Sequence, residues 1–209
     1  MLLLLFFLLM QQALAQDYMK AWRILDEMKH RYERVGVRAT FSFDQDLVGS
    51  HPCQGEGTLL LKEGMFRMAF DGQEVINDGH TVWTYLEDEN EVNVTEYDPD
   101  SDGMSPWKLI TTYEDRFEFT LEYVGLEEVD GETVHVIDLV PRGFHDWLEH
   151  ARIYVTEQAN TLKGWVLSAR NGGESTYIIT DYREDLFLRD NDFTFHERDY
   201  PSVEIIEFR

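Results

Sequence analysis

The stretch from residue 59 to residue 97 constrains the fold most, because short alternating segments follow one another with only a few residues between them. In one of these segments Phe66, Met68 and Phe70 occupy every second position, with Arg67 between the first two. Successive side chains of a β-strand point to opposite faces, so such a strand places its large apolar groups on one face and Arg67 on the other. The stretch is therefore predicted to form consecutive strands of one sheet.

The joints between these segments carry hairpin turn signals. Asp71-Gly72 and Asp78-Gly79 fit tight turns, since glycine accepts a positive φ and aspartate tolerates it. Residues 73–77 between them are just long enough for one strand. Residues 80–87 form the next predicted strand, with Thr, Trp and Tyr on one side and Val, Thr and Leu on the other. Because neither side is purely polar, we expect other parts of the chain to cover both faces.

The rest of the chain adds two predicted helices and more strands. A helix is predicted over residues 17–33, where apolar side chains recur every third or fourth position, and another over residues 105–114, which has a proline in its first turn. The further strands are predicted over residues 38–44, 117–123, 133–140, 151–156, 163–169, 175–182, 192–195 and 203–206. With no linker and no internal repeat, the pattern predicts one mainly β (α+β) domain, in which a single curved antiparallel sheet carries helices on its concave side.

The N-terminus has the pattern of a secretory signal peptide. Residues 2–10 are uniformly apolar, and Ala13-Leu14-Ala15 precedes Gln16. The run is too short to span a bilayer, which needs about 20 residues, and Ala-x-Ala is typical of a cleavage site. We expect residues 1–15 to be a cleaved signal peptide and residues 16–209 to be the mature domain. An uncleaved anchor or a buried helix is the alternative. Since no cysteine lies near the predicted cleavage site, we expect an exported protein that is not itself lipidated.

Composition narrows the function classes. The formal net charge of −23 argues against binding to nucleic acid or to an anionic membrane surface, because both would be repelled. Hydrophobic residues make up 43% of the chain, which is enough for a full core and excludes disorder. Cys53 is the single cysteine, so no intramolecular disulfide can hold the fold together.

The sequence contains no complete motif for catalysis or metal binding. The segment from Asp98 to Gly103 looks like the first half of a calcium loop, but Leu109 stands where a bidentate glutamate is required. The seven histidines lack the spacing of a metal site, and no nucleophile or phosphate-binding motif is present. We therefore expect that the protein is not an enzyme and that it has no catalytic residue, no metal and no cofactor.

The segment GTLLLKEGMFRMAFDGQEVINDGHTVWTYLEDENEVNVTEYDP resembles the LolA family, the periplasmic carriers of lipoproteins in Gram-negative bacteria. The shared pattern is G-x-L-x-x-K, a turn, an apolar strand, and a strand introduced by Asn77-Asp78-Gly79 and followed by W-x-Y. Residues 188–209 also resemble the closing pattern of the family, an F-x-F strand, a proline turn and a short apolar strand. One departure is Glu63-Gly64, which replaces the arginine that latches the lid of some members.

The resemblance implies an incomplete β-barrel with helices as a lid over a hydrophobic cavity. It also implies a monomeric periplasmic carrier that shields the acyl chains of lipoproteins and moves them from the inner to the outer membrane. Its partners would be acylated lipoproteins, an inner-membrane lipoprotein-releasing transporter and an outer-membrane acceptor, without nucleic acid or a stable membrane anchor. The residues predicted to line the cavity and its lid are Trp22, Leu25, Phe41, Phe43, Phe66, Met68, Phe70, Trp107, Ile110, Phe117, Phe119 and Leu121.

Three alternatives stay open at this point. Each apolar stripe would look the same if it merely filled an ordinary core. A regulatory half-barrel that senses lipoproteins is the second alternative. The third is a secreted acidic carbohydrate-binding module or hydrolase, which would present Trp and Tyr on an exposed platform with polar neighbours.

Overall fold

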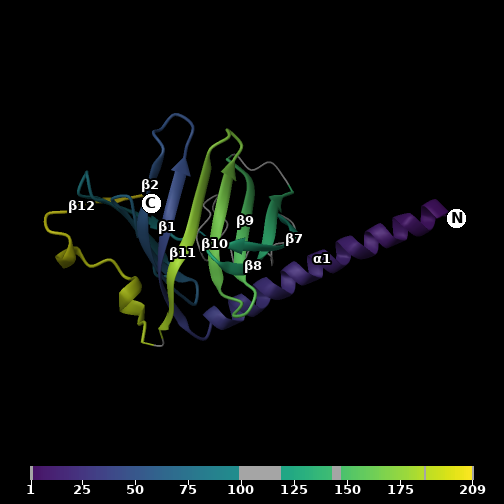
Figure 1. Cartoon of the computed structure of the whole chain (residues 1–209). Coiled ribbons are helices and arrows are strands. Elements are labelled where there is room, and N and C mark those ends of the chain that lie inside the picture. The colour runs from purple at the N-terminus through teal and green to yellow at the C-terminus, as the bar shows by residue number, and fades with distance from the viewer. Residues whose placement is uncertain (1, 99–118, 143–146, 186, 209) are drawn as a thin grey trace. The chain divides into compact units, whose positions relative to one another are not determined.

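The computed structural model describes residues 2–98, 119–142, 147–185 and 187–208 (Figure 1). Within this part the chain has one α-helix, α1 (Leu2–Tyr32), and a 12-stranded sheet. The strands are β1 (Gly36–Asp46), β2 (Cys53–Lys62), β3 (Met65–Phe70), β4 (Gln73–Asn77), β5 (Thr81–Leu86), β6 (Glu91–Glu96), β7 (Phe119–Val129), β8 (Glu132–Pro141), β9 (Leu148–Thr156), β10 (Leu162–Ala169), β11 (Glu174–Asp185) and β12 (Glu204–Glu207).

The sheet is open, with the strand order β12-β6-β5-β4-β3-β2-β1-β11-β10-β9-β8-β7. The consecutive strands β1 to β6 pair in antiparallel fashion, as do the consecutive strands β7 to β10, whereas β12 pairs with β6 in parallel. The predicted mainly β class and open sheet are thus confirmed, while the lid over a cavity stays a prediction. The predicted helix over residues 17–33 forms the C-terminal part of α1; the one predicted over residues 105–114 lies outside the described residues.

The chain divides into two compact units. The first contains α1 up to Lys29 and strands β7 to β10. The second contains most of β1, strands β2 to β6, residues 177–185 of β11 and the C-terminal segment.

In the first unit, apolar side chains from the C-terminal part of α1 and from the strands form a buried core. Ala21, Leu25 and Met28 on α1 are fully buried, as the predicted helical spacing requires.

A polar contact also joins α1 to the strands of the first unit: the ammonium of Lys20 lies 3.9 Å from the ring centre of Tyr123 on β7. The Tyr123 hydroxyl is 3.1 Å from Nδ1 of His135 on β8. Burial and then the charge of Lys20 lower the pKa of His135, so this ring is held neutral.

In the second unit, a two-residue turn joins β3 to β4 as predicted, whereas three residues, 78–80, connect β4 to β5. Asp71 and Gly72 have φ of 51° and 68°, which is the left-handed geometry of a type I′ hairpin turn. At the next turn the carboxylate of Asp78 accepts hydrogen bonds from the backbone N–H groups of His80 and Thr81, at 2.9 and 2.7 Å. These local bonds fix the register of β3, β4 and β5.

The strand predicted over residues 192–195 is wrong. The segment forms a short 3₁₀ helix, η2 (Asp190–Phe193), and a second one, η3 (Glu197–Asp199), follows. The reason is local hydrogen bonding: the Asp192 carboxylate accepts from the backbone N–H of Arg189 at 2.8 Å, and the Asp192 N–H donates back to the Arg189 carbonyl at 2.8 Å. An aspartate that bonds its own turn favours a tight helix over a sheet ladder.

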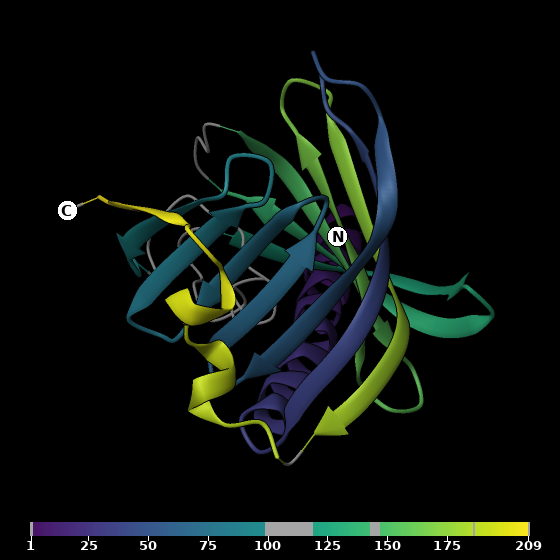
Figure 2. The ribbon, with the colours of Figure 1, turned by 90° about the vertical axis from the view of Figure 1, so that its left-hand side faces the viewer.

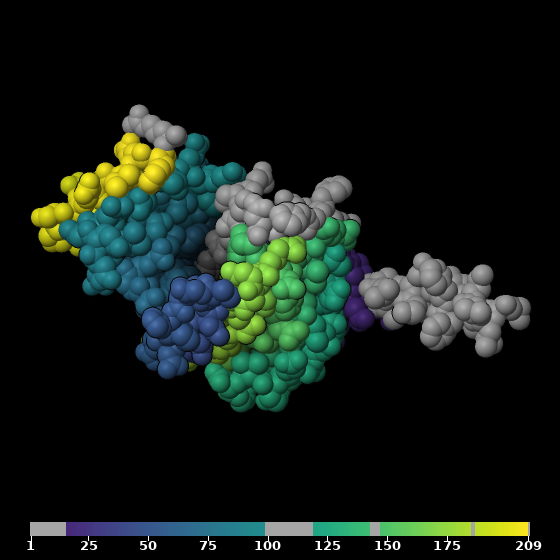
Figure 3. Space-filling view, turned by 90° about the horizontal axis from the view of Figure 1, so that it is seen from above, coloured from purple at the N-terminus to yellow at the C-terminus, as the bar shows by residue number. Residues whose placement is uncertain are grey.

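The C-terminal segment, residues 188–203, lies across one face of β3 to β6 (Figures 2 and 3). The Tyr200 ring lies 4.6 Å from the Tyr85 ring and 4.5 Å from the Phe195 ring, centre to centre. Phe193 of η2 is fully buried. The expectation that another part of the chain covers the Tyr-bearing face of residues 80–87 is confirmed.

Candidate functional site

An aromatic cluster in the second unit is formed by Phe41, Phe43, Phe70 and Tyr177. Four pairs of these rings meet edge to face, with ring centres 5.5 to 6.2 Å apart. Phe41 is fully buried and Phe70 is half-buried. Edge-to-face pairs favour fixed ring positions beyond what burial alone provides, so β1, β3 and β11 hold these rings as one apolar surface.

Two glycines on β2 make room for this cluster. Gly57 and Gly55 stand directly opposite Phe41 and Phe43 in the β1 and β2 register. A Cβ on Gly57 would lie 2.3 Å from Cζ of Phe41, and one on Gly55 would lie 3.0 Å from the Phe43 ring. The two rings therefore lean over the bare backbone of β2, a place where only glycine allows such an approach.

The same face of the sheet continues from the cluster through β3, β4 and β5. The register fixes which side chains lie opposite each other on this face. Met68 is opposite Val75, Phe70 is opposite Gln73, and Gln73 is opposite Leu86. Burial decreases from Met68, which is buried, to Val75, which is half-buried, and Leu86 is half-buried as well. We call this surface the apolar face; its members are Phe66, Met68, Phe70, Val75, Val82 and Leu86.

Three polar side chains of β4 and β5 share this face: Gln73, Asn77 and Thr84. Asn77 is opposite Phe66 on β3 and Val82 on β5. It is 0% exposed. Its Oδ1 accepts a hydrogen bond from the backbone N–H of Gly79 at 2.6 Å. Its Nδ2 has no hydrogen-bond partner within the described part of the chain.

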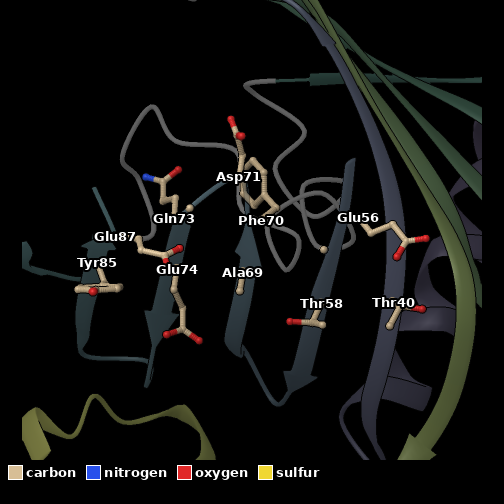
Figure 4. A pocket seen from close by; sticks show the side chains of 12 residues that line it. Thr40, Glu56, Thr58, Ala69, Phe70, Asp71, Gln73, Glu74, Tyr85 and Glu87 are labelled. Carbon is tan, nitrogen blue, oxygen red and sulfur yellow. The ribbon is translucent and has the colours of Figure 1, made fainter. Parts of the chain in front are cut away.

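The opposite face of the same strands is polar. Thr40, Thr58, Ala69, Glu74 and Tyr85 form one cross-strand row from β1 to β5. They line an open hollow of about 540 Å³, which Figure 4 shows with further carboxylates at its border. The bordering residues are Glu56, Asp71 and Glu87. Carboxylates and hydroxyls are poor surroundings for a hydrocarbon, so this hollow does not suit an acyl chain.

Hydrogen bonds connect the charged groups near this hollow to each other and to the C-terminal segment. Arg67 donates to the Glu74 carboxylate at 2.7 Å, and the Tyr200 hydroxyl donates to the same carboxylate. Burial and then this bond to Glu74 raise the pKa of Tyr200, which keeps its proton. A hydrogen bond with Asp71 and then burial raise the pKa of the Cys53 thiol, opposite to what a nucleophile needs. Among the described residues, no cluster of His, Cys, Asp and Glu could hold a metal ion.

The residues predicted to line a cavity fall into three groups. Phe41, Phe43, Phe66, Met68 and Phe70 come together on one face of the second unit. The members in the first unit are Trp22, which is half-buried, and Leu25, Phe119 and Leu121, which are buried. Trp107, Ile110 and Phe117 lie outside the described residues. The role of all twelve as ligand contacts stays a prediction.

Sequence analysis missed Tyr177, Val75 and Asn77 on the same face. Tyr177 lies in the predicted strand over residues 175–182, and its alternation with buried Ser175 and Ile179 was the available signal. For Asn77 no sequence signal distinguishes a turn residue from a buried one.

Comparison with known proteins gives one family match. The family model described as outer membrane lipoprotein carrier protein LolA matches residues 37–196. Among curated proteins, none matches this sequence. In the described part of the chain, no helix is long and apolar enough to cross a membrane.

Several solved structures are similar. An uncharacterized conserved protein from Thermus thermophilus is 12% identical with a TM-score of 0.61, over 90% of this chain and 99% of that chain. A DUF1329 family protein from Desulfovibrio piger is 12% identical with a TM-score of 0.49, over 85% and 97%. A LolA superfamily protein from Nitrosomonas europaea is 11% identical with a TM-score of 0.45, over 84% and 97%. At these identities the Thermus protein shows a shared fold and nothing about function.

Proposed function

The chain belongs to the LolA family, and on that premise we propose that it is a periplasmic carrier that shields the acyl chains of lipoproteins and moves them from the inner to the outer membrane. The observation that supports the proposal most is the apolar face beside the aromatic cluster. Aromatic and aliphatic side chains make up most of this surface, and Val75, Val82 and Leu86 among them are only half-buried. Such side chains can take up hydrocarbon.

The energetics of cargo transport fit this surface. Each methylene of an acyl chain that leaves water contributes about 0.8 kcal/mol, so a lipoprotein with several chains needs an apolar surface to cross an aqueous compartment. Met68 can adjust to an irregular chain because its side chain is flexible and polarizable. The rings of Phe41 and Phe70, fixed by their edge-to-face contacts, would form a stable wall.

The structure speaks against the carbohydrate-binding alternative. That alternative expects Trp and Tyr on an exposed platform. Trp83 and Tyr85 are instead half-buried, and the Tyr85 ring packs 4.6 Å from Tyr200 of the C-terminal segment.

The proposal includes the other expected properties of such a carrier. Residues 1–15 would be cleaved on export, and the mature protein would be a monomer. It would receive acylated lipoproteins from an inner-membrane lipoprotein-releasing transporter and deliver them to an outer-membrane acceptor. Helical segments would close over the acyl chains, and amide hydrogen exchange of α1 with and without ligand tests that closure.

Competition with an apolar dye tests the proposed function. The mature protein, purified from the periplasm, should bind an environment-sensitive dye, and a triacylated lipopeptide should displace it. The same peptide without acyl chains is the control ligand. Lack of displacement from a folded protein would contradict the carrier proposal.

A pair of variants tests which face of β5 contacts the acyl chains. Val82→Asp introduces a charge on the apolar face, and Thr81→Asp introduces the same charge at a half-buried position on the opposite face. We expect Val82→Asp to weaken lipopeptide binding at least tenfold more than Thr81→Asp, since a carboxylate beside hydrocarbon must be desolvated. Equal effects of the two variants would mean that this face does not hold the acyl chains.

A further inference from the structure

The unpartnered amide of Asn77 is the observation that leads beyond acyl binding. Its Nδ2 is buried and has no partner in the described part of the chain, although the residue is 0% exposed. Buried polar groups in native proteins are nearly always hydrogen-bonded, because a donor removed from water without a partner is costly. A buried amide with no partner in the protein is therefore free to bond a group from outside the chain, such as water or a ligand.

The turn fixes which end of the amide is unpaired. Oδ1 accepts from the Gly79 N–H at 2.6 Å, and a flipped amide would set its NH₂ against that N–H, donor against donor. Since the amide is planar, Nδ2 must lie on the side away from Gly79.

The turn itself needs only an acceptor at this position. The neighbouring Asp78 shows that a carboxylate can bond backbone N–H groups of the same turn, those of His80 and Thr81. The NH₂ group of Asn77 has no function in the turn, so the turn does not explain why the residue is an amide.

The register gives the surroundings of this donor. Asn77 is directly opposite Phe66 on one side and Val82 on the other, both members of the apolar face. The face extends from this row to the row of Phe70 and Leu86, four residues along the strands or about 13 Å. A ligand there would meet mostly hydrocarbon surface, interrupted by Gln73 and Thr84, with the buried and unpaired donor of Asn77 at one end.

An acyl chain attached to a lipid or lipopeptide has that distribution of groups, since its hydrocarbon ends in the carbonyl of an ester or amide. We propose that Nδ2 of Asn77 donates a hydrogen bond to this linking carbonyl, so that the site selects ester- or amide-linked acyl chains over ether-linked alkyl chains. The inference rests on the proposed function, because it requires that hydrocarbon binds to the apolar face.

The test compares two probes on the mature full chain: a diacylglycerol-linked fluorescent lipid and its dialkyl ether analogue with the same chain length. The wild type should bind the ester probe about fivefold to tenfold more tightly than the ether probe. This ratio is expected from the net contribution of one hydrogen bond between uncharged groups. Asn77→Asp removes the NH₂ and keeps the acceptor for Gly79, and Asn77→Leu keeps the approximate shape without polar groups. Both variants should bind the two probes equally, with ether affinity within about twofold of the wild type.

Asn93→Asp is the matched control, because Asn93 is half-buried on the same face of β6, opposite Thr84. It should keep the preference for the ester. The ratio of affinities within each variant separates recognition from a change in stability, so a destabilised Asn77 variant still gives an answer.

Each outcome decides one claim. A wild type that binds both probes equally, or an Asn77→Leu variant that keeps the ester preference, overturns the role of Asn77 and leaves acyl binding intact. A folded wild type that binds neither probe overturns the carrier proposal itself, and this inference with it.

Discussion

Replacing Gly57 by alanine tests whether the aromatic cluster is packed as the structure shows. Without steric conflict, alanine in place of a strand glycine stabilises a protein by about 0.4–1 kcal/mol, because the unfolded chain has less freedom to lose. Here the new Cβ would lie 2.3 Å from Cζ of Phe41 and 2.7 Å from the carbonyl oxygen of Ala69. The clash involves both a fully buried ring and a backbone atom, and the backbone cannot rotate away.

The size of the effect follows from what surrounds Phe41. Its ring is confined by Phe70 and Tyr177, whose ring centres lie 6.2 and 5.8 Å away, so moving it disturbs the cluster. Overpacking of this kind costs about 1–3 kcal/mol. We expect Gly57→Ala to lower the free energy of unfolding by about 1–3 kcal/mol, opposite in sign to the effect of alanine at an unhindered site.

Urea unfolding followed by circular dichroism measures this free energy. Gly55→Ala is the matched control, because its Cβ would meet only the outer edge of the Phe43 ring at 3.0 Å and should cost less. Phe41→Ala alone should cost about 3–5 kcal/mol, and adding Gly57→Ala to it should cost less than Gly57→Ala costs in the wild type, because the ring is gone and only the contact with the Ala69 carbonyl remains. A Gly57→Ala protein as stable as the wild type, or additive effects in the double variant, would refute the proposed packing.

Three further predictions concern side chains outside the apolar face. Tyr200→Phe removes the hydroxyl that bonds Glu74 and should lower the unfolding free energy by about 1 kcal/mol, measured by urea unfolding. His135 has a pKa below its ordinary 6.5, so the unfolded chain takes up the proton first; stability should fall as pH drops below about 6.5, and His135→Gln should reduce that fall in unfolding curves at several pH values. Asp138→Asn loses the two-pronged bond from Arg152, at 2.7 and 2.9 Å, and should cost about 1–2 kcal/mol at neutral pH by the same assay.

Local sequence determined the strands and their faces. The alternation around Arg67 predicted which side chains share a face, because the two-residue period of a strand leaves no other choice. Asp71-Gly72 predicted a hairpin, since a left-handed pair of residues is needed there and few residue types permit it. These features depend on neighbours in the chain, and their chemistry can be read directly from the residues.

Five members of the candidate site could also be predicted, because Phe41, Phe43, Phe66, Met68 and Phe70 alternate on strands that are adjacent in the chain. Tyr177 joins them from β11, more than a hundred residues after β1. Which distant strand pairs with β1 is a competition among all the strands, and alternation alone does not decide it.

The tertiary structure alone decided how the C-terminal segment is used and how Asn77 is placed. The segment around Phe193 has a strand-like pattern, yet it forms a 3₁₀ helix, and Phe193 is fully buried where this segment lies against the sheet (Figure 2). Asn77 belongs to a turn motif in the sequence, and only the folded structure shows that its side chain is fully buried. Sequence by itself thus determined the local geometry, where each residue limits its own backbone. Which segments cover each face of the sheet was decided by packing, because the burial of a side chain and of its hydrogen-bonding groups depends on the whole folded chain.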